Sequence, residues 1–175
     1  MKKINSKKQK ISWLVLDGAK PHPTLPELWV ARTREALILD LIEKIKNIYH
    51  IDKILLYSNN SEFLQKVAVK SDKIISQPHK ITDNFIFGNW LAEQVEIHNL
   101  NKIFYWGGGA SPFITTEILE TLCVSIIDGE NILYTNNFFS ADWVALTPAK
   151  TVLDIADKIR MDNNLAYVLW QEKGI

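Results

Sequence analysis

Three consecutive glycines, Gly107 to Gly109, form the part of this sequence with the clearest chemical meaning. They follow the apolar stretch Ile103 to Trp106, whose residues favour a strand, and they precede Thr115 and Thr116, which are typical of the start of a helix. Glycines let the backbone approach a ligand closely, and the unpaired amides at a helix start attract anions. The order of strand, glycine turn and helix therefore predicts a pocket for a phosphate-bearing ligand such as a nucleotide.

A second turn of small residues, Asp17-Gly18-Ala19-Lys20, follows an expected buried strand at Trp13 to Leu16. If that strand lies beside the strand before Gly107, both turns face one crevice, because the carboxyl ends of parallel strands meet at one edge of a sheet. Neither turn matches the dinucleotide fingerprint or the phosphate-loop pattern, so ordinary dehydrogenases and P-loop enzymes are disfavoured. The residues expected to contact the nucleotide are Leu16, Asp17, Gly18, Ala19, Lys20, Gly107, Gly108, Gly109 and Ser111.

Strands and helices are expected to alternate through most of the chain. This alternation predicts an α/β fold with a mainly parallel sheet and helices on both faces. The prolines between Pro21 and Thr33 predict a long loop at the ligand edge, and amphipathic spacing predicts a helix from Ala36 to Tyr49. The other expected strands are 53–57, 73–75, 102–106, 131–134 and 142–147, and the other expected helices are 62–69, 87–99, 115–124, 149–159 and 163–173.

The composition is that of a folded domain with balanced charge. The chain has 175 residues, 47% of them hydrophobic, and a formal net charge of zero, so nothing in the balance predicts nucleic acid or a membrane surface as a partner. Residues 1–11 are expected to form a flexible basic tail and residues 12–175 a single domain. Cys123 is the only cysteine, which excludes a disulfide within the chain and fits a cytoplasmic location.

Ordinary structural roles compete with ligand binding for several polar residues. An isolated acid such as Asp142 often caps an element or pairs with a lysine. Lys20 and Arg34 have the alternative role of solvated charges, and Asn136 and Asn137 that of turn formers. The four histidines lack the spacing of metal ligands.

Several short motifs resemble the nucleotidyltransferases similar to molybdenum-cofactor guanylyltransferase. Leu14-Val-Leu-Asp-Gly-Ala19 looks like the Leu-Ala-Gly-Gly opening of that family, and Gly109-Ala110-Ser111-Pro112-Phe113 stands in the place of its Gly-Asp-x-Pro-Phe segment. Arg34-Glu35-Ala36-Leu37 is similar to the basic segment before its first helix, and Ser140-Ala-Asp142 to the start of a later strand. The resemblance covers most of the chain in order and implies the Rossmann-like, glycosyltransferase-A-type fold of the nucleotide-diphosphosugar-transferase superfamily.

The resemblance also implies a reaction, in which a phosphate or hydroxyl acceptor attacks the α-phosphate of a nucleoside triphosphate and releases pyrophosphate. In that family a basic residue helps to neutralise phosphate charge, and the aspartate of the second motif binds Mg²⁺. However, Ala110 stands where the family has this aspartate. If the protein is active, we expect Asp17 and Asp142 to hold the metal from a different side, with Lys20 and Arg34 on the phosphates. Two alternatives are therefore open: a metal-dependent nucleotidyltransferase, or a catalytically inactive relative that acts as a nucleotide-binding, phosphometabolite-binding or dimerisation module. The expected partner is a nucleoside triphosphate or another phosphorylated small molecule, and a homodimer is left open.

Overall fold

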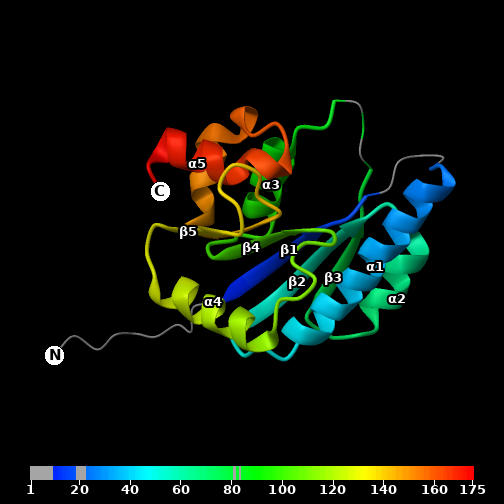
Figure 1. Cartoon of the computed structure of the whole chain (residues 1–175). Helices are drawn as coiled ribbons and strands as arrows, with labels where there is room; N and C mark the ends of the chain where they lie inside the picture. Colours follow the sequence, from blue (N-terminus) through cyan, green and yellow to red (C-terminus); the bar gives the residue numbers. More distant parts are fainter. Residues whose placement is uncertain (1–9, 19–22, 81, 83) are drawn as a thin grey trace.

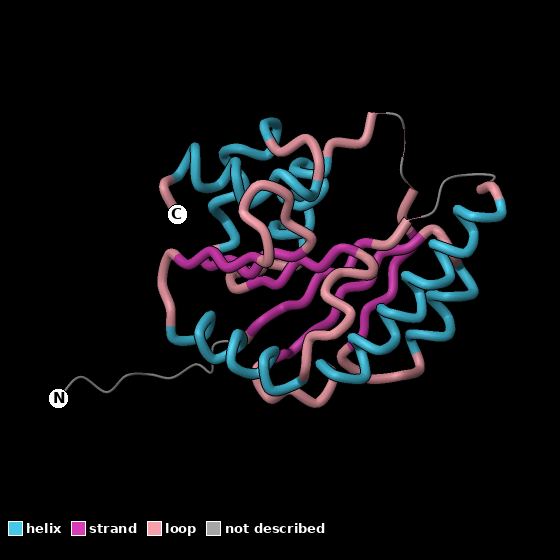
Figure 2. Tube along the Cα trace, in the orientation of Figure 1, coloured by secondary structure: helices cyan, strands magenta, loops and turns pink. Residues whose placement is uncertain are grey.

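The computed structural model describes residues 10–18, 23–80, 82 and 84–175, which form a six-stranded sheet with helices on both faces (Figure 1, Figure 2). The strand order across the sheet is β3-β2-β1-β4-β6-β5. The strands are β1 (Ile11–Leu16), β2 (Ile51–Ser58), β3 (Ile74–Pro78), β4 (Ile103–Gly107), β5 (Ile132–Thr135) and β6 (Trp143–Thr147). The helices are α1 (Leu25–Ile45), α2 (Ser61–Ala68), α3 (Phe87–Ile97), α4 (Thr116–Asp128) and α5 (Leu165–Lys173), with two 3-10 helices, η1 (Ala149–Lys158) and η2 (Asp162–Asn164).

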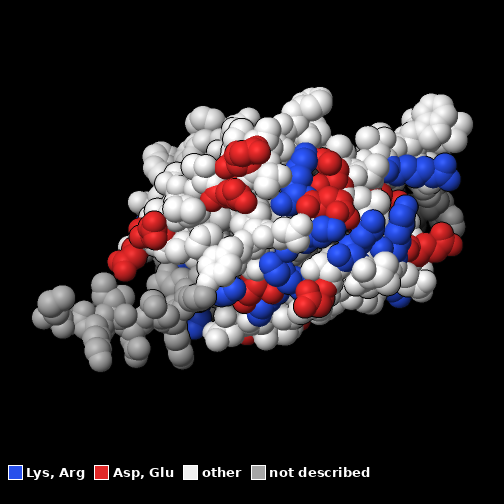
Figure 3. Space-filling model, turned by 90° about the horizontal axis from the view of Figure 1, so that it is seen from below, with Lys and Arg blue, Asp and Glu red and all other residues white. Residues whose placement is uncertain are grey.

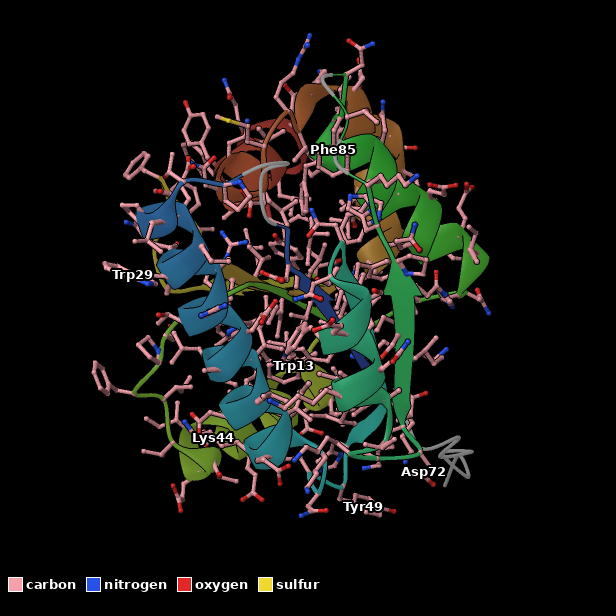
Figure 4. All side chains as sticks on the ribbon, turned by 90° about the vertical axis from the view of Figure 1, so that its right-hand side faces the viewer. Trp13, Trp29, Lys44, Tyr49, Asp72 and Phe85 are labelled. Atoms are coloured by element: carbon pink, nitrogen blue, oxygen red, sulfur yellow. The ribbon has the colours of Figure 1, made fainter. Side chains whose placement is uncertain are left out.

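Two apolar cores lie on the two faces of the sheet. Helices α1, α2 and α4 cover one face, where Ile42 and other apolar side chains pack around Trp13. Figure 4 looks onto α1 and α2, with Trp13 in the interior between them. Helices α3, η1 and α5 cover the other face, where Leu91, Tyr105 and Leu169 belong to the second core. The expected arrangement of a sheet between two helical layers is confirmed.

The sheet is mainly parallel, but its last two strands reverse direction. Strands β1 to β4 pair in parallel, whereas β6 pairs antiparallel with β4, and β5 pairs antiparallel with β6. Because β6 runs against β4, its first residue Trp143 lies opposite Trp106 near the carboxyl end of β4. The residue before β6, Asp142, is thereby brought to the glycine turn that follows β4.

Helix α1 begins at Leu25, so the expectation of a loop continuing to Thr33 is wrong. Thr24 is the N-cap residue, and the Glu27 carboxylate accepts a hydrogen bond from the Thr24 backbone N–H at 2.9 Å. Pro26 lies in the first turn, where the N–H that proline lacks has no helical partner in any case. The prolines that suggest a loop therefore belong partly to a helix start.

Most other elements match their predicted ranges to within a few residues. Residues 149–158 form a 3-10 helix, and the helix expected from Asn163 is divided into η2 and α5. Strand β1 already begins at Ile11, and residues 1–9 of the expected basic tail lie outside the described residues.

Basic and acidic side chains are interspersed on the lower face of the molecule, over α1, α2 and α4 (Figure 3). Several of them form ion pairs there, including Lys44 with Asp40, and Glu43 with both Lys46 and Lys70. None of the helices in the described ranges is both long enough and apolar enough to cross a bilayer.

Candidate functional site

The turns that follow β1 and β4 lie side by side and form one edge of a pocket. The Gly108 N–H donates to the carbonyl oxygen of Leu16 at 3.2 Å, and the Gly107 N–H donates to the carbonyl oxygen of Asp142 at 2.9 Å. The pocket has a volume of about 630 Å³, which is within the range of small-molecule sites. The sequence-predicted residues that line it are Leu16, Gly18, Arg34, Gly107, Gly108, Gly109, Ser111 and Asp142.

Close contacts inside the protein explain all three glycines. A Cβ atom at Gly107 would lie 3.1 Å from the carbonyl oxygen of Asp142. A Cβ atom at Gly108 would lie 3.1 Å from Oδ1 of Asp17 and 3.5 Å from Nε of Arg34. At Gly109 the backbone φ angle is +88°, which side-chain-bearing residues rarely adopt, and a Cβ atom would lie 3.2 Å from Cγ of Arg34. The glycine turn therefore lies directly against the side chains of Asp17 and Arg34.

Asp17 and Arg34 form an ion pair next to the turn. Nη2 of Arg34 is 2.9 Å from Oδ1 of Asp17, and Nη2 also donates to the carbonyl oxygen of Gly18. The Ser58 hydroxyl donates to the other carboxylate oxygen of Asp17 at 3.1 Å. Asp17 is only 4% exposed, so its charge is balanced within the protein instead of being presented to a ligand.

The hydrogen bonds of Asp17 bear on the ligand-binding roles expected of Asp17 and Arg34. The sequence placed Asp17 among the nucleotide and metal ligands, but Asp17 is not among the pocket-lining residues, and both carboxylate oxygens already accept hydrogen bonds. Arg34 does line the pocket, although its guanidinium is bound to Asp17 and Gly18. Ala19 and Lys20 lie outside the described residues, so their expected contacts stay predictions.

Two tryptophans hold the loop after the glycines. The Trp106 indole donates to the carbonyl oxygen of Ala110 at 3.2 Å, and the Trp143 indole donates to the Ser111 hydroxyl at 3.0 Å. The two indoles stack with their centroids 5.5 Å apart. The Ala110 side chain packs against the apolar core of α1 and α4, which explains why an uncharged residue is accommodated at this position.

Two amides of the loop are free to bind a ligand. Within the described ranges, the N–H groups of Gly109 and Ser111 have no hydrogen-bond acceptor, whereas the Ala110 N–H donates to the carbonyl oxygen of Gly107. Both residues line the pocket. Unpaired backbone N–H groups of turns bind anions, so these two donors, on either side of Ala110, are candidates for binding phosphate oxygens.

Asp142 lies at the exposed rim of the pocket and is held by Asn136. The Asn136 amide donates to the Asp142 carboxylate at 2.8 Å, and the Asp142 backbone N–H donates to the side-chain oxygen of Asn136 at 3.0 Å. Asn136 therefore has the role in local structure that the sequence allowed, and this role fixes the direction of a pocket-lining carboxylate.

Sequence reasoning missed a further wall of the pocket, which carries Asp162. The Tyr105 hydroxyl donates to the Asp162 carboxylate at 2.8 Å, and the Ala141 N–H donates to the carbonyl oxygen of Asn163 at 2.8 Å. Burial, together with the charge of Asp162, raises the pKa of Tyr105 well above its usual value, so the hydroxyl remains a donor at neutral pH. The charged residues Arg160 and Asp162, between the helices expected at 149–159 and 163–173, were the sign of this wall in the sequence.

Arg160 and Phe85 also line the pocket. Arg160 is exposed, and its guanidinium has no hydrogen bond or ion pair with any other described residue. Phe85 is labelled in Figure 4, in the segment that leads into α3. The pocket thus combines free backbone amides, an aromatic ring, an unpaired cation and two carboxylates.

The arrangement of carboxylates fits a metal only in company with a ligand. Among the described residues, no group of three or more His, Cys, Asp or Glu could hold a metal ion. Asp142 and Asp162 both line the pocket, and Mg²⁺ in proteins usually takes one or two carboxylates together with substrate phosphates.

Comparison with known proteins places the fold. No family model and no curated protein matches the sequence. Among solved structures, a protein described as a nucleotide-diphospho-sugar transferase of Desulfovibrio desulfuricans G20 matches with a TM-score of 0.66 at 8% identity, over 93% of this chain and 74% of that one. A CMP:2-keto-3-deoxy-manno-octonic acid synthetase complexed with CTP matches with a TM-score of 0.60 at 12% identity, over 95% of this chain and 87% of that one.

A third structure, Rv0371c of Mycobacterium tuberculosis H37Rv in complex with manganese, matches with a TM-score of 0.58 at 13% identity, over 94% of this chain and 84% of that one. The chain therefore has the fold of the nucleotide-diphospho-sugar transferases, as the resemblance implied. At identities of 8–13% these likenesses establish the fold alone.

Proposed function

We propose that this protein binds a nucleoside triphosphate in the pocket between the turns after β1 and β4, and that it is a nucleotidyltransferase. One observation carries the proposal: the turn with the free Gly109 and Ser111 amides opens into the same pocket of about 630 Å³ as the Leu16–Gly18 turn. Phosphate oxygens would accept from these amides. The aromatic ring of Phe85, on the pocket wall, offers a surface on which a base can stack.

Magnesium is part of this proposal, with Asp142 as its main protein ligand and Asp162 as the second. When bound, the ion would neutralise phosphate charge and orient the α-phosphate for attack by the acceptor. Asp17 is left out of this assignment because Arg34 and Ser58 already bind its carboxylate. The manganese complex of Rv0371c supports divalent metal use within this fold.

The basic residues are proposed to have different roles. Arg34 has mainly a structural role, since it binds Asp17 and the Gly18 carbonyl and thereby fixes the turn after β1. Lys20 is proposed to screen phosphate charge, as the resemblance implied. The finer resemblance to molybdenum-cofactor guanylyltransferase-like proteins is also a proposal.

Ala110 favours the second candidate function, a catalytically inactive nucleotide-binding protein. Its methyl group packs against the apolar core at the position where the resemblance calls for the magnesium aspartate. In this alternative the pocket binds the same class of ligand without turnover, and the chain acts as a binding or dimerisation module.

A thermal-shift screen of the four ribonucleoside triphosphates, with and without Mg²⁺, separates the two candidates. Stabilisation that needs Mg²⁺, and that is lost in Asp142→Asn but kept in Asp157→Asn on the exposed side of η1, supports the nucleotidyltransferase. Stabilisation that is indifferent to Mg²⁺ supports the binder. The absence of stabilisation by any triphosphate under either condition contradicts both. The nucleotide with the largest shift reports the preferred base.

A further inference from the structure

The two arginines that line the pocket differ in whether other residues of the protein bind them. The Arg34 guanidinium is committed to Asp17 through both Nε and Nη2, and to the Gly18 carbonyl. This pair is neutral as a unit. Among the described residues that line the pocket, Arg160 is the cation without an internal partner.

The carboxylates nearby do not neutralise Arg160 either. Asp142 accepts from the Asn136 amide, and Asp162 accepts from the Tyr105 hydroxyl and from the Asn163 N–H. No ion pair joins Arg160 to either acid in the described part of the chain. The guanidinium is therefore available, with its planar set of donors, for a ligand oxyanion.

The backbone of Arg160 is held firmly against α3. The carbonyl oxygen of Arg160 accepts from the Phe87 N–H at 3.3 Å, and that of Ile159 accepts from the Gly88 N–H at 2.8 Å. A Cβ atom at Gly88 would lie 2.1 Å from the carbonyl oxygen of Ala156, so η1 and α3 approach too closely for any side chain there. The position from which the Arg160 side chain extends is thus set by packing.

We infer that Arg160 binds a phosphate group of the ligand, and that without a divalent cation the pocket takes a nucleotide with one phosphate in preference to a nucleoside triphosphate. This inference rests on the proposed function and specifies the ligand of the same site. The reason is the charge count among the described residues that line the pocket: Asp17 balances the charge of Arg34, so one free guanidinium, that of Arg160, faces the two carboxylates Asp142 and Asp162. A single phosphate is matched by Arg160 and the loop amides, whereas a triphosphate adds anionic groups that face carboxylates unless a cation intervenes.

The test is calorimetric titration of the protein, free of divalent metal, with the four ribonucleoside monophosphates, the matching triphosphates and the nucleosides. The expected result is tighter binding of a monophosphate than of its triphosphate, with the order reversed by Mg²⁺. Arg160→Gln should weaken the monophosphate about tenfold or more and leave nucleoside affinity unchanged, because a hydrogen bond to a charged group contributes roughly 1.5–3 kcal/mol. Arg32→Gln, on the exposed side of α1, is the matched control and should change neither.

Different results of these titrations would overturn the role of Arg160, the ligand preference or the proposed function. Equal monophosphate affinity in the wild type and Arg160→Gln, or a loss in Lys20→Gln instead of Arg160→Gln, overturns the role of Arg160 while leaving the proposed function intact. Metal-free binding of triphosphates at least as tight as that of monophosphates overturns the ligand preference. Failure of every nucleotide to bind the wild type, with and without Mg²⁺, overturns the proposed function as well. An unchanged melting temperature of Arg160→Gln in the absence of ligand shows that the variant is folded.

Discussion

Oδ1 of Asp17 lies 3.1 Å from the place that a Cβ atom of Gly108 would occupy. The carboxylate that follows the first strand and the glycine turn that follows the fourth strand are therefore in direct contact. Arg34 completes the contact, since its guanidinium binds Asp17 and its aliphatic part lies against Gly109. The glycine turn therefore packs against the ion pair of Asp17 and Arg34, and the two should support each other.

Gly109→Ala should destabilise the protein more than Gly174→Ala. Both glycines have positive φ angles, +88° and +68°, so alanine costs about 1–2 kcal/mol of backbone strain at either position. Only at Gly109 would the new methyl group also meet a neighbour, Cγ of Arg34 at 3.2 Å, whereas it would meet nothing within 4 Å at Gly174. Urea unfolding should give an excess cost of about 1 kcal/mol or more at Gly109. Equal losses of unfolding free energy in the two variants would show that the contact of the turn with Arg34 does not restrict residue 109.

Asp17→Asn should cost about 2–3 kcal/mol of unfolding free energy. The substitution leaves the Arg34 guanidinium without its counter-charge, and the pair is largely buried on the Asp17 side. Asp40→Asn, which breaks the exposed pair with Lys44 on α1, is the control and should cost less than about 0.5 kcal/mol. Chemical denaturation of the two variants measures both values. A cost at Asp17 as small as that at Asp40 would mean that the ion pair does not support the turn.

Tyr105→Phe should lower stability by about 1–2 kcal/mol, because Asp162 then loses the hydroxyl that donates to it within the pocket wall. The same change should weaken nucleotide binding, since Arg160 lies in the segment that this bond ties to β4. Tyr134→Phe on the exposed edge strand β5 is the control, because no hydrogen bond of its hydroxyl is present among the described residues. Thermal unfolding and calorimetry report the two effects. A loss of stability without any change in binding would separate Tyr105 from the ligand site.

Stability should fall as the pH drops below about 6.5, partly through two partly buried histidines. Burial lowers the pKa of His79, and burial with the nearby Lys53 charge lowers the pKa of His98, so the unfolded chain binds these protons before the folded protein does. Their contribution is complete above the unfolded pKa and is lost as the pH falls through the folded pKa, about 1.4 kcal/mol for each unit of depression.

His98→Gln tests this pH dependence. The His98 ring nitrogen lies 3.2 Å from the Tyr57 hydroxyl, and glutamine keeps a hydrogen-bonding group there that cannot be protonated. Denaturation curves from pH 7 to pH 5 should show a shallower loss of stability in the variant than in the wild type. Identical slopes would assign the acid sensitivity to other groups.

The sequence allowed the site to be predicted in part, and the residues that were missed share a physical reason. The strand and turn patterns around Leu16 and Gly107 were sufficient, because local hydrophobic runs and glycines mark strand ends directly. The partners of Asp17 could not be predicted in the same way, since Arg34 and Ser58 are distant in sequence. Ser58 meets Asp17 through the pairing of β1 with β2, and Arg34 meets it from helix α1.

The far wall was missed because it depends on how the last elements pack. Asp162 and Arg160 reach the pocket because η1 packs closely on α3 and because the Tyr105 hydroxyl of β4 donates to the Asp162 carboxylate. The α1 start was misjudged for a local reason, since the cap at Thr24 and Glu27 outweighs the prolines around it. Asp142 reaches the glycine turn through an antiparallel strand, which the expectation of a mainly parallel sheet did not foresee.

Binding of the ligand phosphate by the loop after β4 can be tested by amide chemical-shift mapping of ¹⁵N-labelled protein during a nucleotide titration in Mg²⁺. We expect the largest shifts on the Gly109 and Ser111 amides, with the Trp106 and Trp143 indole signals moving at the same ligand concentration because both indoles bind this loop. Saturable shifts that cluster elsewhere, with the Gly109 and Ser111 signals unmoved, would contradict it.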